Sequence, residues 1–211
     1  IMNQELKKRI FSSIILIPLS LYFTIKGSIF FILFLSIIFF VSLSEWFKMA
    51  KSIELKILGT IFLLFSLYSS YYLRDRGLED FLIIIIICIT TDMGGYIFGK
   101  LFKGPKLTKI SPNKTYSGVA GAFILALIFS CVFALIYKPS LISFNETGLI
   151  FFVILISGIS QIGDLIISYF KRSSKIKNTG KIFPGHGGML DRIDGMIFVF
   201  PFVYILIIIL Q

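Results

Sequence analysis

Long apolar segments separated by short polar connections make up most of the chain, and they limit what it can fold into. The segments lie near residues 10–25, 29–44, 57–73, 81–98, 118–137, 149–170 and 196–210, and the first and last are the shortest. A helix needs about 20 apolar residues to cross the hydrocarbon of a bilayer. With 56% hydrophobic residues among 211, the chain is too apolar for a soluble domain of this size. We therefore predict an all-α, polytopic integral membrane protein with about seven transmembrane helices, folded as one membrane domain.

Basic residues predict how the helices are oriented. Most of them fall in the amino-terminal tail and in the connections 45–56, 99–117 and 171–195. The other side of the membrane would carry only Lys26, Arg74, Arg76 and Lys138. Under the positive-inside rule, the amino terminus and both long polar loops face the cytoplasm. We expect a multi-pass protein of the inner (cytoplasmic) membrane with a polar cavity that faces the cytosol. Pro18 interrupts the first segment and no small-residue cleavage site follows, so we expect an anchored helix there instead of a signal peptide.

Two carboxylates inside predicted spans point to a site. Asp92 lies seven residues before Gly99, and Asp164 lies seven residues before Lys171, so both should sit about 10 Å below the cytosolic boundary. An ionised carboxylate in hydrocarbon costs at least ~2.5 kcal/mol, so each should face a water-filled cavity, a cation or a basic partner. A structural alternative is a hydrogen bond to a nearby hydroxyl. The hydroxyls in question belong to Thr90, Thr91 and Ser160.

Small and sulfur-containing residues in the spans have simpler interpretations. The glycines near the two carboxylates permit helices to approach closely; they are Gly94, Gly95, Gly99, Gly158 and Gly163. Cys88 and Cys131 both lie inside predicted spans, so we expect apolar free thiols and no disulfide.

The first long polar loop, GPKLTKISPNKTYSG at residues 104–118, combines hydroxyls with a fixed charge. Ser111, Lys114 and Thr115 precede a glycine-containing helix start, an arrangement suited to gripping phosphate oxygens. A capped turn before a membrane helix would look the same, and the loop alone does not separate the two interpretations.

The second polar loop, KRSSKIKNTGKIFPGHGGMLDRID at residues 171–194, holds the densest set of functional groups. Gly185, Gly187 and Gly188 surround His186, the only histidine, and they permit successive backbone N–H groups to converge on an anion.

Charged residues flank this glycine-rich turn. Asp191 and Asp194, three residues apart, share one helix face and suit Mg²⁺. Arg192, with Lys171 and Arg172, can neutralise phosphate charge. The alternatives are a solvated loop and helix capping by the aspartates.

The pattern from Ser168 to Asp194, SYFKR followed by KNTGKIFPGHGGMLDRID, resembles the signature of the phosphatidate cytidylyltransferase family, also called CDP-diacylglycerol synthases. Residues 92–99 and 111–118 resemble that family's acidic span and S-P-x-K-T loop, so the similarity covers roughly residues 85–205. The resemblance implies transfer of CMP from CTP to phosphatidate, with Mg²⁺ and a possible second cation. One position departs from the family, because Asn178 stands where it usually has Asp.

The resemblance also implies roles for individual residues and for parts of the chain. Metal ligands would be Asp191, Asp194, Asp164 and Asp92, and further catalytic residues would be Lys171, Arg172 and His186. Substrate-binding residues would be Ser111, Lys114, Thr115, Ser168, Lys177, Gly185, Gly187, Gly188 and Arg192. Residues 1–80 would be variable amino-terminal spans, and residues 81–211 the catalytic portion. The partners would be CTP and phosphatidate in the bilayer, without nucleic acid, and a homodimer is compatible with this.

Two other functions fit part of the pattern. A CTP-dependent polyprenol or phytol kinase would transfer the γ-phosphoryl group instead of CMP. A cation transporter would use Asp92 and Asp164, but it would leave PGHGGMLDRID without a purpose.

Overall fold

The computed structural model describes residues 4–108, 110–142, 146–180, 182 and 187–210. Its elements are α1 (Gln4–Lys26), α2 (Ser28–Met49), α3 (Ile53–Arg76), α4 (Leu78–Phe102), α5 (Tyr116–Tyr137), η1 (Ser140–Ile142), α6 (Glu146–Ser173), α7 (Leu190–Ile193) and α8 (Met196–Leu210). Among the described residues, extended pairing is limited to one isolated bridge between Lys106 and Thr115. The all-α prediction is confirmed for this part of the chain.

Seven helices lie at the seven predicted positions, but only five are long and apolar enough to cross a membrane. These five are α2 to α6. α8 has 15 residues and falls short, and the part of α1 whose side chains the structure describes, Ile14–Lys26, is also too short to count as a span. At 1.5 Å per residue, α8 extends about 22 Å, less than the ~30 Å hydrocarbon core. The structure therefore confirms five candidate spans and does not confirm the predicted count of about seven.

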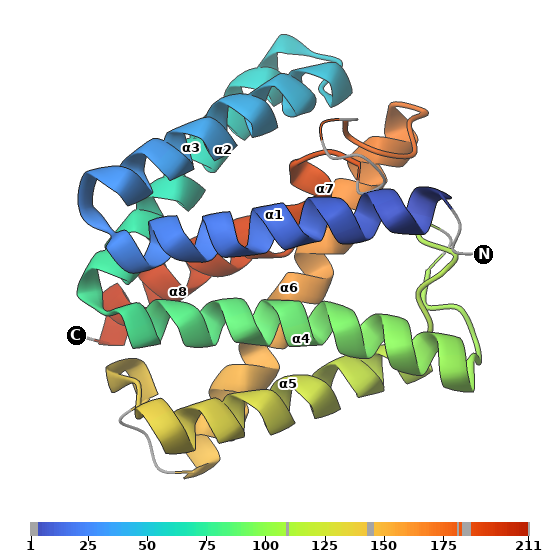
Figure 1. Cartoon of the computed structure of the whole chain (residues 1–211). Coiled ribbons are helices and arrows are strands. Elements are labelled where there is room, and N and C mark those ends of the chain that lie inside the picture. Colours follow the sequence, from blue (N-terminus) through green and yellow to red (C-terminus); the bar gives the residue numbers. More distant parts are fainter. Residues whose placement is uncertain (1–3, 109, 143–145, 181, 183–186, 211) are drawn as a thin grey trace.

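The polar connections gather at one end of the helices (Figure 1). The α4–α5 connection lies at the same end as the start of α1, and the last residues of α8 lie at the opposite end. Large apolar side chains are exposed along the helices, for example Leu135 at 78% and Ile209 at 72%. Such a surface suits lipid and does not suit water.

Helices α4 and α5 pack backbone to backbone through glycine. A Cβ atom on Gly118 would lie 2.7 Å from the carbonyl oxygen of Gly95, and one on Gly94 would overlap the backbone of Gly121. These contacts confirm the prediction of close helix approach for Gly94 and Gly95. Gly158 differs, because nothing lies within 4 Å of its Cβ position, so the prediction is wrong for that residue.

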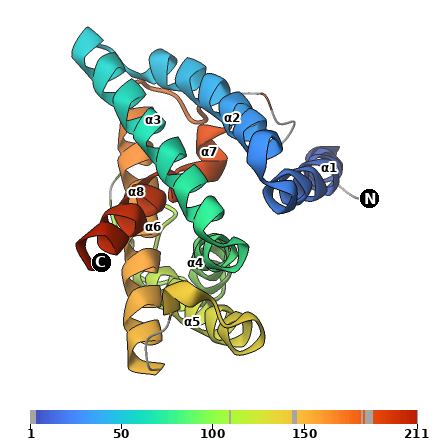
Figure 2. The same cartoon turned by 90° about the vertical axis from the view of Figure 1, so that its left-hand side faces the viewer.

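Helix α6 runs beside α4 and α5 and carries the chain towards α7 and α8 (Figure 2). One buried apolar cluster joins α2, α3, α4, α6 and α8, and a second lies around Trp46, Leu190 and Ile197. Cys88 is buried, Cys131 is half-buried, and both are free thiols. Leu190 of α7 belongs to the second cluster, and Asp191 beside it pairs with Lys171 at the end of α6, so α7 is held between the two.

Candidate active site

A lysine from the first polar loop meets a carboxylate on α6. Lys114 Nζ lies 2.6 Å from Asp164 Oδ2, and the two side chains are 24% and 26% exposed. The ammonium also donates to the carbonyl oxygen of Gln161 at 3.4 Å, and Ser168 donates to Asp164 Oδ1 at 3.2 Å. The membrane-depth carboxylate of Asp164 is thus satisfied by a basic partner and a hydroxyl.

The hydroxyls considered as structural partners are used elsewhere. Thr90 donates to the carbonyl oxygen of Ile86 at 2.6 Å, and Thr91 donates to Ser157 at 2.8 Å. Ser160 Oγ is buried and has no hydrogen-bond partner within the described part of the chain. The described residues therefore do not support the structural alternative, in which one of these hydroxyls would donate a hydrogen bond to Asp92 or Asp164.

Asp92 lies on the apolar helix α4 and is not covered by other parts of the described chain. Its side chain is exposed, and within the described residues no hydrogen bond to its carboxylate is found. It lies within electrostatic range of Asp164, Lys114 and Arg192. Asp92 therefore lies near the Lys114–Asp164 pair, while the predicted shared depth of the two carboxylates stays a prediction.

A second network forms around Asp191 in the last polar loop. Lys171 at the end of α6 donates to Asp191 Oδ1 at 2.9 Å. Asp191 Oδ2 accepts from the Thr179 N–H at 2.8 Å, the Thr179 hydroxyl at 3.1 Å and the Gly188 N–H at 3.0 Å. Burial raises the pKa of the Asp191 carboxyl, but the hydrogen bonds from Lys171, Gly188 and Thr179 outweigh it, so the pKa lies below its ordinary value. Asp191 is therefore held as a carboxylate.

Asp194 connects the two networks. It is buried, its Oδ2 lies 4.0 Å from Lys171 Nζ, and its Oδ1 accepts from the Gly195 N–H at 3.0 Å. Burial, followed by the negative charges of Asp164 and Asp92, raises the pKa of the Asp194 carboxyl well above its ordinary value. Carboxylates from three elements thus repel one another at one place.

Such a set of oxygen donors fits a hard divalent cation, whose charge would relieve the repulsion. Asp92, Asp164 and Asp194 lie within electrostatic range of one another. In the described ranges, however, no three His, Cys, Asp or Glu side chains stand close enough together to hold a metal. Asp191 already accepts four hydrogen bonds from the protein. Its assignment as a metal ligand stays a prediction.

The first polar loop forms the capped turn that was one interpretation of its sequence, and its predicted phosphate contact stays a prediction. Thr115 accepts from the Gly118 N–H at 3.1 Å and is the N-cap of α5. Ser111 makes a turn, in which its carbonyl oxygen accepts from the Lys114 N–H at 3.0 Å. Pairing of Leu107 N with the Lys114 carbonyl oxygen at 2.8 Å closes the loop. Of the three residues predicted to grip phosphate, only Lys114 reaches the carboxylates.

The remaining predicted site residues are exposed or lie outside the described residues. Arg172, Lys177 and Asn178 are exposed. Arg192 is exposed as well and lies within electrostatic range of Asp92. Gly185 and His186 lie outside the described residues, so their predicted roles stay predictions.

Two of the predicted glycines are described, and both pack against acidic side chains. Gly187 has φ +89°, and a Cβ atom there would lie 2.7 Å from Asp191 Oδ2. A Cβ atom on Gly188 would overlap Thr179 and Glu45. Both positions therefore require glycine, as the predicted close backbone approach implies.

Sequence reasoning missed Glu45 on α2 and its partner Thr179. Glu45 is fully buried, and its carboxylate accepts from the Thr179 hydroxyl at 2.7 Å and from the N–H groups of Met189 and Leu190, both at 2.9 Å. The available signal was a carboxylate within the apolar run FFVSLSEWF. A carboxylate in an apolar run is also the signal that identified Asp92. Glu45, however, is the first residue of the connection 45–56, and we explained the charges of that connection by membrane topology alone.

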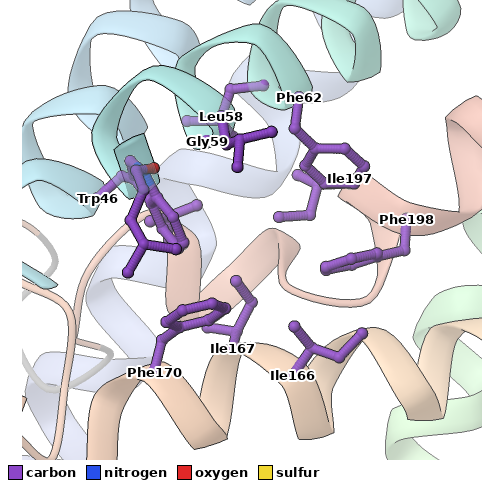
Figure 3. A pocket seen from close by; sticks show the side chains of 12 residues that line it. Trp46, Leu58, Gly59, Phe62, Ile166, Ile167, Phe170, Ile197 and Phe198 are labelled. Carbon is purple, nitrogen blue, oxygen red and sulfur yellow. The ribbon is translucent and has the colours of Figure 1, made fainter. Parts of the chain in front are cut away.

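An apolar groove of about 270 Å³ lies beside α7 (Figure 3). Helices α2 and α3 contribute Trp46, Leu58, Gly59 and Phe62; α6 contributes Ile166, Ile167 and Phe170; α8 contributes Ile197 and Phe198. Leu190 lines the groove immediately before Asp191. The groove and the charged networks therefore share α6 and α7.

Comparisons with known proteins give consistent results. The model of the cytidylyltransferase family matches residues 54–210. Phosphatidate cytidylyltransferases of Staphylococcus saprophyticus and Bacillus subtilis are 41% and 37% identical over 141 and 143 residues, which cover 65% of this chain and 52% of each relative. The chain thus spans about half the length of these two relatives. A phosphatidate cytidylyltransferase of Rickettsia felis is 32% identical over 209 residues, which cover 96% of this chain and 92% of that protein.

Proposed function

Since the chain belongs to the cytidylyltransferase family, we propose that it transfers CMP from CTP to phosphatidate, giving CDP-diacylglycerol and pyrophosphate. The observation that carries the proposal is the position of a Lys–Asp cluster beside an apolar groove. A nucleoside triphosphate requires a charged cluster of this kind, and a lipid requires an apolar groove. The name of the Rickettsia felis relative, which aligns over nearly the whole chain, supports the same reaction.

The reaction needs positioning and charge neutralisation more than covalent chemistry. A phosphate oxygen of phosphatidate attacks the α-phosphorus of CTP, the bond from that phosphorus to the bridging oxygen of the β-phosphate breaks, and pyrophosphate leaves. Lys114 and Lys171, each held by a carboxylate, would bind phosphate oxygens with their remaining N–H groups. Arg192 lies near Asp92 and would add a third cation.

Asp92, Asp164 and Asp194 are the residues that would hold Mg²⁺. The ion would supply charge neutralisation at the phosphates. Asp194 has the strongest need for such a partner, because it is buried among like charges. Asp191 instead fixes Lys171 and the loop before α7.

The apolar groove supports a lipid substrate. Ile167 and Phe170 line it and flank Ser168 on α6, while Leu190 adjoins Asp191 on α7. A lipid whose acyl chain occupies this groove would have its headgroup next to the charged networks.

We further propose that the polar end of the helices faces the cytoplasm and that the membrane is the inner (cytoplasmic) one. The basic connections at that end support this orientation. Accessibility of a cysteine introduced at exposed Lys106 to a membrane-impermeant reagent, in intact cells and in inverted vesicles, tests it. A homodimer stays a prediction, which light scattering of the detergent-solubilised protein checks.

The position of a label in CTP tests the reaction. Purified protein is incubated with phosphatidate, Mg²⁺ and CTP labelled at either the α- or the γ-phosphate, and lipids are then extracted. CMP transfer places the α-label in lipid and leaves the γ-label in pyrophosphate. A polyprenol or phytol kinase given its own lipid would do the reverse, and a transporter would place neither label in lipid.

A further inference from the structure

Glu45 contacts the loop before α7 from outside the segment that the family model matches. That segment begins at residue 54, and Glu45 lies on α2 in the portion expected to be variable. Its side chain has 0% exposure. A buried carboxylate is costly unless hydrogen bonds satisfy it, so its partners show why it is tolerated.

The partners are all in the last polar loop. The N–H groups of Met189 and Leu190 donate to Glu45 Oε1 and Oε2 at 2.9 Å each. These are groups at the start of α7, where a short helix leaves backbone N–H groups without a partner of their own. A carboxylate on α2 therefore holds the amino-terminal end of the helix that carries Asp191.

Thr179 joins Glu45 directly to Asp191. Its hydroxyl lies 2.7 Å from Glu45 Oε2 and 3.1 Å from Asp191 Oδ2, and its backbone N–H donates to the same Asp191 oxygen at 2.8 Å. A hydroxyl has one proton to donate, so the two carboxylates share it, and the contact with Glu45 is the shorter one. The two carboxylates therefore hold the Thr179 segment from opposite sides, and Asp191 in turn holds Lys171.

We propose that Glu45 is a positioning residue for the CMP transfer proposed above. It fixes Thr179 and the start of α7, and thereby sets the position of Asp191 and of the Lys171 ammonium. This inference rests on the proposed function, since the consequence for catalysis requires that Lys171 act on phosphate.

Four variants test the inference. Glu45→Gln keeps the side-chain size but replaces one acceptor oxygen by a donor. Thr179→Val removes the shared hydroxyl and Thr179→Ser retains it. Ser42→Ala is the matched control, because Ser42 is buried one turn earlier on α2 and its hydroxyl has no hydrogen-bond partner within the described residues.

Steady-state kinetics per amount of folded protein give the first measurement. We expect Glu45→Gln to lower kcat by about 10- to 100-fold, the usual cost of removing a group that orients a functional side chain, with the KM for phosphatidate unchanged. Thr179→Val should lower kcat, whereas Thr179→Ser and Ser42→Ala should match the parent protein. Because Glu45 and Thr179 act through one contact, the double variant Glu45→Gln/Thr179→Val should lose less than the product of the single losses.

Hydrogen exchange gives a second measurement that needs no activity. Amide protons of Met189 and Leu190 should exchange faster in Glu45→Gln than in the parent protein. Their exchange rates should be unchanged in Ser42→Ala. A parental kcat in Glu45→Gln, or unchanged exchange at these two amides, would overturn the inference. If the parent protein forms no labelled lipid, the proposed function fails and the catalytic role of Glu45 fails with it, while faster exchange would still show that Glu45 anchors α7.

Discussion

Asp194→Asn separates the function of a buried carboxylate from its contribution to folding. The Asn side chain keeps a carbonyl oxygen for the Gly195 N–H, so the local hydrogen bond at 3.0 Å can persist. The lost charge is attracted by Lys171 at 4.0 Å, which is about 4 kcal/mol at an effective dielectric constant near 20. It is also penalised by burial and repelled by Asp164 and Asp92, the causes that raise the pKa of the Asp194 carboxyl.

Burial and the two repulsions outweigh the attraction of Lys171, so the fold gains no stability from this charge. We therefore expect the free energy of unfolding without divalent cations to change by about 1 kcal/mol or less, a shift in Tm of about 2–4 °C at this size. CTP-dependent lipid labelling should fall by about 100-fold or more, the usual cost of losing one group that stabilises transition-state charge. Mg²⁺ at 100 times its Kd should stabilise the parent protein by about 2.7 kcal/mol and the variant by much less.

Thermal unfolding in EDTA and in Mg²⁺, together with the label assay, measures these effects. Asp75→Asn is the control, because it removes the same charge from an exposed site at the end of α3. Retained labelling in Asp194→Asn would refute the catalytic assignment. A Tm lower by more than about 10 °C in EDTA would show instead that the carboxylate holds the fold together.

Three further substitutions test other parts of the structure. Lys114→Met leaves Asp164 without its cation, and because that pair is a quarter exposed, we expect a loss of about 1–3 kcal/mol in thermal unfolding and a higher KM for CTP. Ile166→Trp fills the apolar groove, so the KM for phosphatidate should rise severalfold while the KM for CTP stays constant; equal changes in both would argue against an acyl-chain site. Gly94→Leu forces α4 away from the backbone of Gly121, and the folded fraction measured by size-exclusion chromatography should fall by more than half.

Periodicity and hydropathy were enough to predict the positions of the helices, and they also led us to predict a shared depth for Asp92 and Asp164. Both depend on the fixed rise of a helix and on the cost of a charge in hydrocarbon, which act locally. The number of spans was less predictable, because α8 continues the apolar pattern but contains only 15 residues. The length of α8 depends on where α7 ends, and the position of α7 depends on its contacts with α2.

Contacts between distant segments explain what was missed at the site. Glu45 and Thr179 are separated by 134 residues, and the identity of one residue does not predict contact with the other. For Thr115, the sequence could not distinguish a phosphate contact from an N-cap, because both use the same hydroxyl and the same following glycine. Asp191 shows a related limit, since its four hydrogen-bond donors arise from the fold of the loop and not from the spacing of the two aspartates.

The backbone contact between α4 and α5 has a consequence for motion at the site. Because Gly94 and Gly118 let the two backbones touch at the crossing, we expect the two helices and their connection to behave as one rigid hairpin. Asp92 and Lys114 both belong to that hairpin, and they must move together. Any opening that admits a nucleotide then has to occur between the hairpin and α6, where the contact to be broken and remade is the one between Lys114 and Asp164.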